Sequence, residues 1–184
     1  MNPRLAWLYV IGGGLGLGAA AALTLEKIAK LRDPAYVPTC SLNPVVSCGS
    51  VMDVMDSAQA EAFGFPNPLL GIAAFSVVVT TGVAVLAGFE PPRWYRVAMN
   101  AGTAFGVVFV HWLIFASLYD IRALCPYCMV VWVVVLPMFW YTTLDTWPAL
   151  APLRRVHSAV LALWYAVIVV LVLFAFWDYW SSLV

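Results

Sequence analysis

Two cysteines separated by two residues, Cys125 and Cys128, form the motif Cys-Pro-Tyr-Cys directly before an apolar run. Thiols at this spacing can cycle between a dithiol and a disulfide, and the dipole at the start of a helix stabilises a thiolate. Pro126 suits the first turn of a helix, where a missing N–H is tolerated. Because the motif borders a hydrophobic segment, it predicts electron transfer between thiols and a lipid-soluble acceptor. A structural disulfide and half of a zinc site are the alternative interpretations.

The composition of the chain predicts an integral membrane protein. Of its 184 residues, 64% are hydrophobic and only 10% are charged, which lies far outside the range of a soluble domain. Nine basic residues balance nine acidic ones, so no overall field attracts nucleic acid. We therefore expect membrane lipids among the partners and no nucleic acid.

Five segments without Asp, Glu, Lys or Arg are long enough to cross ~30 Å of hydrocarbon as helices. They are residues 5–25, 69–89, 97–118, 126–144 and 159–177. The first could instead be a cleaved signal peptide, but its apolar run is longer than such peptides usually have. Three of the four connections are short, which predicts antiparallel neighbours in an up-down bundle. The chain is thus expected to be one all-α membrane domain, residues 1–184.

The remaining connection, residues 26–68, is too long to be a structureless loop in a compact domain. Within it, Ser50 followed by Asp53 resembles a capping box, and Gly64 is a natural helix stop. Apolar residues between them recur at helical spacing: Val51, Met52, Val54, Met55, Ala58, Ala62 and Phe63. This pattern predicts a short amphipathic helix that lies on the membrane surface as a lid. A surface loop with a single helical turn is the alternative.

The same connection carries the other two cysteines, Cys40 and Cys48. Two predicted spans separate them from Cys125, so all four thiols are expected on one side of the membrane. Basic residues are divided too evenly to orient the chain. Cysteine pairs that cycle through disulfides belong outside the cytoplasm, so we expect a cell-membrane protein with a cytoplasmic amino terminus and extracytoplasmic thiols.

Two thiol pairs on one side suggest a relay from a water-soluble protein to an acceptor in the bilayer. A zinc site made of all four cysteines is the competing interpretation, although the seven residues between Cys40 and Cys48 are wide for such a site. We expect no metal.

The arrangement of these residues resembles the vitamin K epoxide reductase family, most closely its bacterial members. The resemblance covers roughly residues 5–145. It rests on Cys40 and Cys48 in a long first loop, on Asn67-Pro68-Leu69-Leu70-Gly71 at the start of the second span, and on Cys125-Pro126-Tyr127-Cys128 at the start of the fourth.

That resemblance implies a four-helix bundle around a quinone, with the loop helix as a lid and the fifth helix outside the core. It makes Cys128 the thiolate that faces the quinone, Cys125 its partner, and Cys40 and Cys48 the shuttle pair. Asn67 would hydrogen-bond a quinone oxygen. Trp132 would lie beside the ring, with an ordinary interfacial tryptophan as the alternative.

The resemblance also implies an activity: reoxidation of a thioredoxin-like oxidase and reduction of a quinone of the menaquinone or ubiquinone type, which supports disulfide formation in exported proteins. Some relatives carry a fused thioredoxin-like domain. This chain ends at Val184, so the partner is expected to be a separate protein. Reduction of vitamin K epoxide and a non-catalytic scaffold with structural disulfides are the alternative functions.

Two further expectations concern individual residues. His111 lies within a predicted span, where an ionisable side chain is a functional candidate by default; it could relay protons to the quinone, or it could be a neutral imidazole bonded to a neighbouring helix. In the relay, we expect Cys48 to face the soluble partner and Cys40 to be the inner member that reaches Cys125.

Overall fold

The computed structural model describes residues 1–43, 45–53 and 66–181. Its long helices are α1 (Pro3–Arg32), α3 (Asn67–Leu86), α4 (Arg93–Phe115), α5 (Pro126–Thr146) and α6 (His157–Ala175). Short elements join or extend them: α2 (Cys48–Asp53), the π-helical turn η2 (Ala116–Asp120), the 3₁₀ helix η3 (Pro148–Arg155) and α7 (Trp177–Ser181). All five long helices are apolar enough to cross a membrane. The predicted all-α membrane fold is confirmed.

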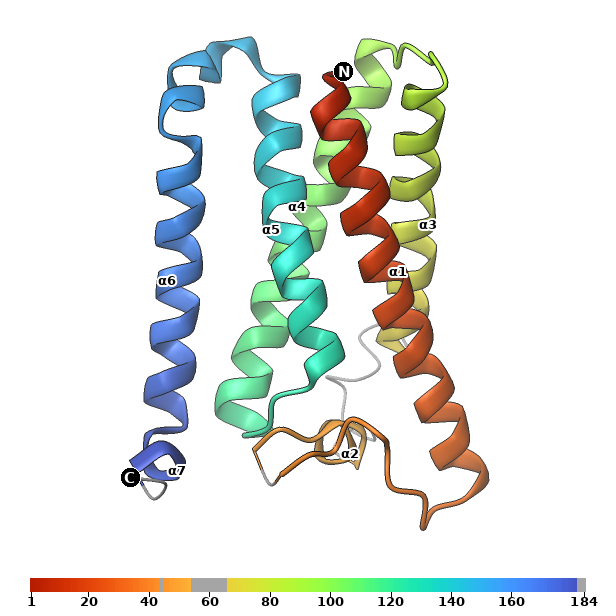
Figure 1. The fold of residues 1–184 in the computed structure, drawn as a ribbon, viewed down its shortest axis with the longest axis vertical. Coiled ribbons are helices and arrows are strands. Elements are labelled where there is room, and N and C mark those ends of the chain that lie inside the picture. Colours follow the sequence, from red (N-terminus) through yellow and green to blue (C-terminus); the bar gives the residue numbers. More distant parts are fainter. Residues whose placement is uncertain (44, 54–65, 182–184) are drawn as a thin grey trace.

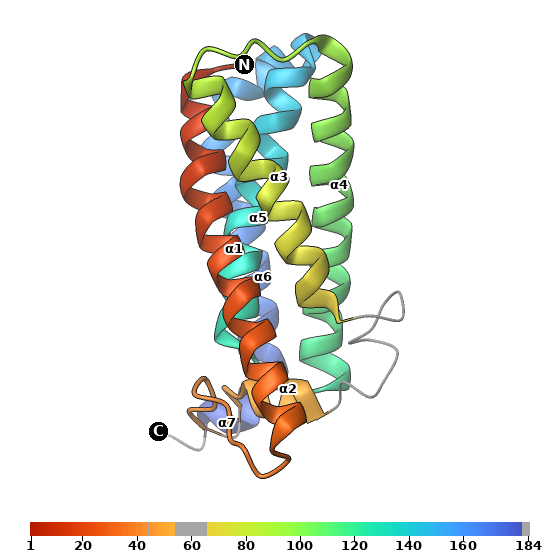
Figure 2. The same ribbon diagram turned by 90° about the vertical axis from the view of Figure 1, so that its right-hand side faces the viewer.

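Four of the long helices form a bundle, and α6 stands beside it (Figures 1 and 2). Helix α1 packs against α3 and α5, and α4 packs against α5. Most of the side chains of α6 are exposed, and Leu161 is its only fully buried residue. The fifth helix therefore lies outside the core.

Glycines allow α1 and α3 to approach closely. A Cβ atom on Gly16 would overlap the ring of Phe75, and one on Gly82 would lie 2.8 Å from the carbonyl oxygen of Ala6. In a bilayer, lipid tails offer an apolar side chain contacts as good as those of another helix, so helices associate through close packing instead. Small residues at such positions allow that close packing.

The end of the bundle opposite the amino terminus carries the loop between α1 and α3, with α2 lying across it (Figure 1). Helix α2 begins at Cys48, two residues before the predicted cap Ser50, because Ser47 and not Ser50 accepts the capping hydrogen bond. The N–H of Ser50 donates to Ser47 Oγ at 3.1 Å. The rest of the predicted lid helix, residues 54–65, lies outside the described residues.

Pro137 interrupts the hydrogen bonding of α5, and α6 repairs the interruption. Proline has no N–H, so the carbonyl of Val133, four residues earlier, loses its helical donor. The hydroxyl of Tyr165 on α6 donates to that carbonyl at 2.5 Å. An unsatisfied carbonyl is costly in hydrocarbon, so this bond gives α6 a specific attachment to the bundle.

We expect Tyr165→Phe to lower the free energy of unfolding in detergent by about 1 kcal/mol, the scale of one interhelical hydrogen bond in a membrane protein. In a Pro137→Ala background the N–H of residue 137 is restored to Val133, so the same substitution should cost much less. Unfolding of the four proteins by denaturant measures this coupling. An equal cost in both backgrounds would contradict the account.

Candidate functional site

The four cysteines gather at the loop end of the bundle, as the count of spans predicted. Cys40 and Cys48 form a disulfide with an S–S distance of 2.05 Å, whereas Cys125 and Cys128 are free thiols. Cys40, Cys48 and Cys125 form one buried cluster with Leu23 of α1 and Ala123. Two of the four sulfurs are joined to each other, so this arrangement lacks the set of thiolates that a tetrahedral zinc site needs.

A tight turn brings the two loop cysteines together. Asn43 Oδ1 accepts hydrogen bonds from the N–H groups of Val45 and Val46, at 3.0 and 2.7 Å. The carbonyl of Val46 in turn accepts from the N–H of Leu42 at 2.8 Å. The chain folds back on itself, and the Cα atoms of Cys40 and Cys48 lie 5.5 Å apart, within the usual range for a disulfide.

Backbone hydrogen bonds then place this loop against the segment that leads to Cys125. The N–H of Leu124 donates to the carbonyl of Val45 at 2.7 Å, and the N–H of Ser47 donates to the carbonyl of Leu124 at 2.9 Å. Val46 and Leu124 form a parallel bridge. The residues that precede Cys48 and Cys125 are thereby fixed side by side.

The segment before Cys125 reaches this position through an irregular end to α4. The π-helical turn η2 ends at Asp120, and Arg122 has a positive φ of 54°. The N–H of Ala123 then donates to the carbonyl of Ser117 at 3.2 Å. The chain reverses direction in a few residues and enters the bridge to the cysteine loop.

As a result, the sulfur of Cys48 lies 3.3 Å from the sulfur of Cys125. Cys48 is fully buried, whereas Cys40 retains 7% exposure. The expected order of the shuttle pair is therefore wrong for this arrangement: Cys48 is the inner member beside Cys125, and Cys40 is the outer one. The physical reason is the bridge through Val46, which holds the Cys48 end of the loop.

The thiol of Cys125 has a lowered pKa, chiefly because the thiol of Cys128 donates a hydrogen bond to it. The backbone N–H groups of Cys128 and Tyr127 add to this, and together they outweigh the burial that would raise the pKa. Cys125 is the N-cap residue of α5, so it lies at the positive end of the helix dipole, which favours a negative charge on its sulfur.

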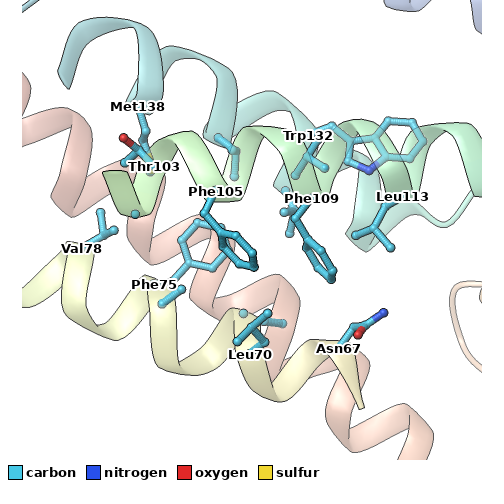
Figure 3. A pocket seen from close by; sticks show the side chains of 18 of the residues that line it. Asn67, Leu70, Phe75, Val78, Thr103, Phe105, Phe109, Leu113, Trp132 and Met138 are labelled. Atoms are coloured by element: carbon cyan, nitrogen blue, oxygen red, sulfur yellow. The ribbon is translucent and has the colours of Figure 1, made fainter. Parts of the chain in front are cut away.

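From the thiols toward the middle of the bundle, a cavity of about 510 Å³ extends between α1, α3, α4 and α5. Its walls are mostly apolar, and Leu70 and Phe75 on α3 lie across from Phe105 and Phe109 on α4 (Figure 3). Cys128 lines this cavity, while Cys125 faces the loop. The volume and lining are those of a site for an apolar small molecule.

Two of the predicted ligand-binding residues lie at the thiol end of this cavity. Asn67 is the first residue of α3 and Trp132 lies on α5, on the opposite side of the cavity (Figure 3). Trp132 is 4% exposed, and its indole nitrogen has no hydrogen-bond partner in the described part of the chain. A buried donor of this kind is costly unless a partner is supplied.

His111, the third predicted ligand-binding residue, lies elsewhere. It is absent from the cavity lining, and its Nε2 accepts a hydrogen bond from the indole N–H of Trp164 on α6 at 3.0 Å. Its Nδ1 contacts the carbonyl of Val107 at 2.8 Å. An indole nitrogen is only a donor, so Nε2 is the acceptor of this bond. The structure therefore places His111 away from the cavity, in the arrangement of the alternative interpretation, an imidazole bonded to a neighbouring helix.

A comparison with known families gives one match. The sequence model of the vitamin K epoxide reductase family matches residues 7–143, a range that includes all four cysteines, the cavity and the loop between α1 and α3. No curated protein matches the chain.

We expect Cys40→Ala to yield an internal disulfide between Cys48 and Cys125, since their sulfurs already lie 3.3 Å apart. Peptide mapping of the oxidised protein under non-reducing conditions detects this bond. The matched variant Cys48→Ala should form no comparable bond between Cys40 and Cys125. A dominant Cys40 to Cys125 bond would restore the order expected from the sequence.

We expect Cys128→Ala to raise the pKa of Cys125, because it removes the hydrogen bond that contributes most to the lowered value. With Cys40 and Cys48 both replaced by alanine, the rate of reaction of Cys125 with a small thiosulfonate can be followed against pH. The midpoint should move to higher pH when Cys128 is also replaced. An unchanged or lower midpoint would contradict the assigned cause.

Proposed function

Because the chain belongs to the vitamin K epoxide reductase family, whose members are oxidoreductases that act with quinones and generally with thioredoxin-like partners, we propose that it is a thiol:quinone oxidoreductase. It oxidises the dithiol of a separate thioredoxin-like oxidase and reduces a quinone of the menaquinone or ubiquinone type. In this role it supports disulfide formation in exported proteins. The observation that carries the proposal is the position of the Cys125–Cys128 pair, with one sulfur against the loop disulfide and the other on an apolar cavity.

The first step is exchange between the partner and the loop disulfide. A partner thiolate attacks Cys40, the more exposed loop cysteine, and releases the thiolate of Cys48. The second partner thiol then attacks the mixed disulfide and releases Cys40. The partner leaves as a disulfide, and the loop pair holds the two electrons.

The second step carries the electrons to the inner pair. The thiolate of Cys48 attacks the sulfur of Cys125 in the Cys125–Cys128 disulfide and releases the thiol of Cys128. Cys40 then attacks Cys48, which closes the loop disulfide and releases Cys125. This step ends in the redox state of the structure, with a disulfide between Cys40 and Cys48 and free thiols at Cys125 and Cys128.

The third step takes place in the cavity, where a bound quinone accepts two electrons and two protons. Cys128 is the sulfur that borders the cavity, so it delivers the electron pair. Cys125, whose lowered pKa keeps it available as a thiolate, closes the disulfide with Cys128 and resets the pair.

The cavity suits a quinone in two respects. Its apolar walls fit a ring with a hydrocarbon tail. Phe105 on α4, which lines the cavity, is 49% exposed, so apolar surface is available there for the ring or the tail. At the thiol end, the side-chain amide of Asn67 and the indole N–H of Trp132 can donate to the two ring oxygens. A bound quinone would thus supply the partner that the buried Trp132 nitrogen lacks among residues 1–43, 45–53 and 66–181.

The thiol end is placed outside the cytoplasm in this proposal, because pairs that cycle through disulfides persist there. The amino terminus, at the other end of the bundle (Figure 1), is then cytoplasmic.

The test is steady-state reduction of a short-chain quinone by purified protein with a reduced thioredoxin-like donor. We expect Trp132→Phe to raise the apparent KM for the quinone about tenfold, the factor that corresponds to one buried hydrogen bond. Trp140→Phe is the matched control, because Trp140 also has a buried indole nitrogen without a partner among the described residues but does not line the cavity.

Cys128→Ser, which removes the thiol on the cavity, gives the negative control and should abolish quinone reduction. Turnover by this variant would refute the proposed function. Equal changes in the apparent KM for the quinone in Trp132→Phe and Trp140→Phe would instead refute the proposed position of the quinone ring beside Trp132.

A further inference from the structure

Glu26, near the carboxyl end of α1, is the only charged side chain that is buried among the residues that the structure describes, at 9% exposure. Both carboxylate oxygens accept hydrogen bonds from the loop that precedes Cys40. Oε1 accepts from the hydroxyl of Thr39, and Oε2 accepts from the hydroxyl of Tyr36 at 2.9 Å and from the N–H of Thr39 at 3.4 Å. A buried carboxylate is stable only when it is compensated in this way.

These hydrogen bonds act directly beside the redox centre. Thr39, which provides two of the three donors, is the residue before Cys40. Leu23, one turn earlier on α1, belongs to the same buried cluster as Cys40, Cys48 and Cys125. The same face of α1 therefore contacts the thiols and holds the chain that carries Cys40.

The two ends of the loop disulfide are held by different means. Cys48 is held by the backbone bridge to Leu124, which does not involve α1. Cys40 is held by the bonds of Thr39 and Tyr36 to Glu26 and by a turn in which the N–H of Ser41 donates to the carbonyl of Pro38 at 3.0 Å. When the disulfide opens, the bridge to Leu124 still holds Cys48, and the bonds of Ser41 and Leu42 to the segment around Cys48 still hold the chain after Cys40. The hydrogen bonds to Glu26 hold the chain before Cys40, so they limit how far this side of the cysteine can move away.

We propose that Glu26 is a positioning residue that keeps Cys40 within exchange distance of Cys48 while the loop disulfide is open. It thereby raises the effective concentration of the Cys40 thiol, which favours closure of the loop disulfide and release of Cys125. The inference rests on the proposed function for its purpose, but its test needs neither quinone nor partner.

The test uses full-length protein in which Cys125 and Cys128 are replaced by serine, so that only the loop pair can react. The protein is equilibrated with mixtures of reduced and oxidised glutathione, and the free thiols are trapped with a maleimide that shifts the band on a gel. In this equilibrium, the loop disulfide and two reduced glutathiones give the loop dithiol and one oxidised glutathione. Its constant measures the effective concentration of the pair.

We expect Glu26→Ala to lower that effective concentration about tenfold or more, as loss of hydrogen bonds to a charged acceptor would do. Glu26→Gln, which keeps one acceptor oxygen for Thr39, should restore part of it. Glu90→Ala removes an exposed carboxylate between α3 and α4, so it should change nothing.

If Glu26→Ala does not fold, Thr39→Val and Tyr36→Phe carry the test, since each removes one hydroxyl donor and leaves α1 intact. Each is expected to lower the effective concentration severalfold. If the variants that fold have the same effective concentration of the loop pair as the parent protein, the inference is overturned. Quinone reduction by the wild-type protein would still support the proposed function in that case.

Discussion

The redox arrangement depends on a few backbone hydrogen bonds between residues 45–47 and Leu124. Disulfide exchange requires two sulfurs to approach within contact distance, and cysteine side chains are too short to correct a misplaced backbone. Cys48 and Cys125 are 77 residues apart in the chain. The parallel bridge between Val46 and Leu124 brings the two cysteines together, because it fixes the segments that lead to Cys48 and to Cys125 side by side. The irregular end of α4 is what delivers Leu124 to this bridge.

Within the bilayer, polar contacts serve a different purpose. Helix α6 has few buried side chains, yet it meets the bundle through specific hydrogen bonds: Tyr165 to the carbonyl of Val133, Trp164 to His111, and Tyr141 to His157. Lipid can replace apolar contacts between helices without loss, whereas it cannot replace a hydrogen bond. The position of α6 is therefore set by polar atoms on an otherwise apolar surface.

Much of the fold could be predicted from the sequence because the dominant signal in a membrane protein is the length of its charge-free runs. The gathering of the four cysteines also followed from the number of spans between them. Trp132 beside the ring was implied by the resemblance to a known family, and its place four residues after Cys128 on one helix agrees with that position. Asn67 at the thiol end of the cavity followed only from the resemblance to a known family.

Other features could not be predicted, because they depend on contacts between distant segments. The bridge that makes Cys48 the inner cysteine joins a loop to a turn after a π-helical segment, and neither has a periodic pattern. His111 was misplaced because α4 is apolar on most of its faces, so its sequence does not indicate which side meets the cavity and which meets α6. Glu26 lies just past the first apolar run, where an acidic residue usually indicates only that the membrane-spanning segment has ended. The groups that donate hydrogen bonds to its carboxylate come from the loop, and they reach it only in the folded chain.

The position of both reactions at one end of the bundle has an energetic consequence for the cell. In the proposed function, oxidation of the partner dithiol releases two protons beside Cys40, and reduction of the quinone consumes two at the Cys128 end of the cavity. Moving one charge across a membrane costs or yields about 2.3 kcal/mol per 100 mV. Here no charge has to cross, because electrons and protons enter and leave at the same surface. The reaction is then electrically silent: the membrane voltage neither drives it nor opposes it, and its rate is independent of how strongly the membrane is energised.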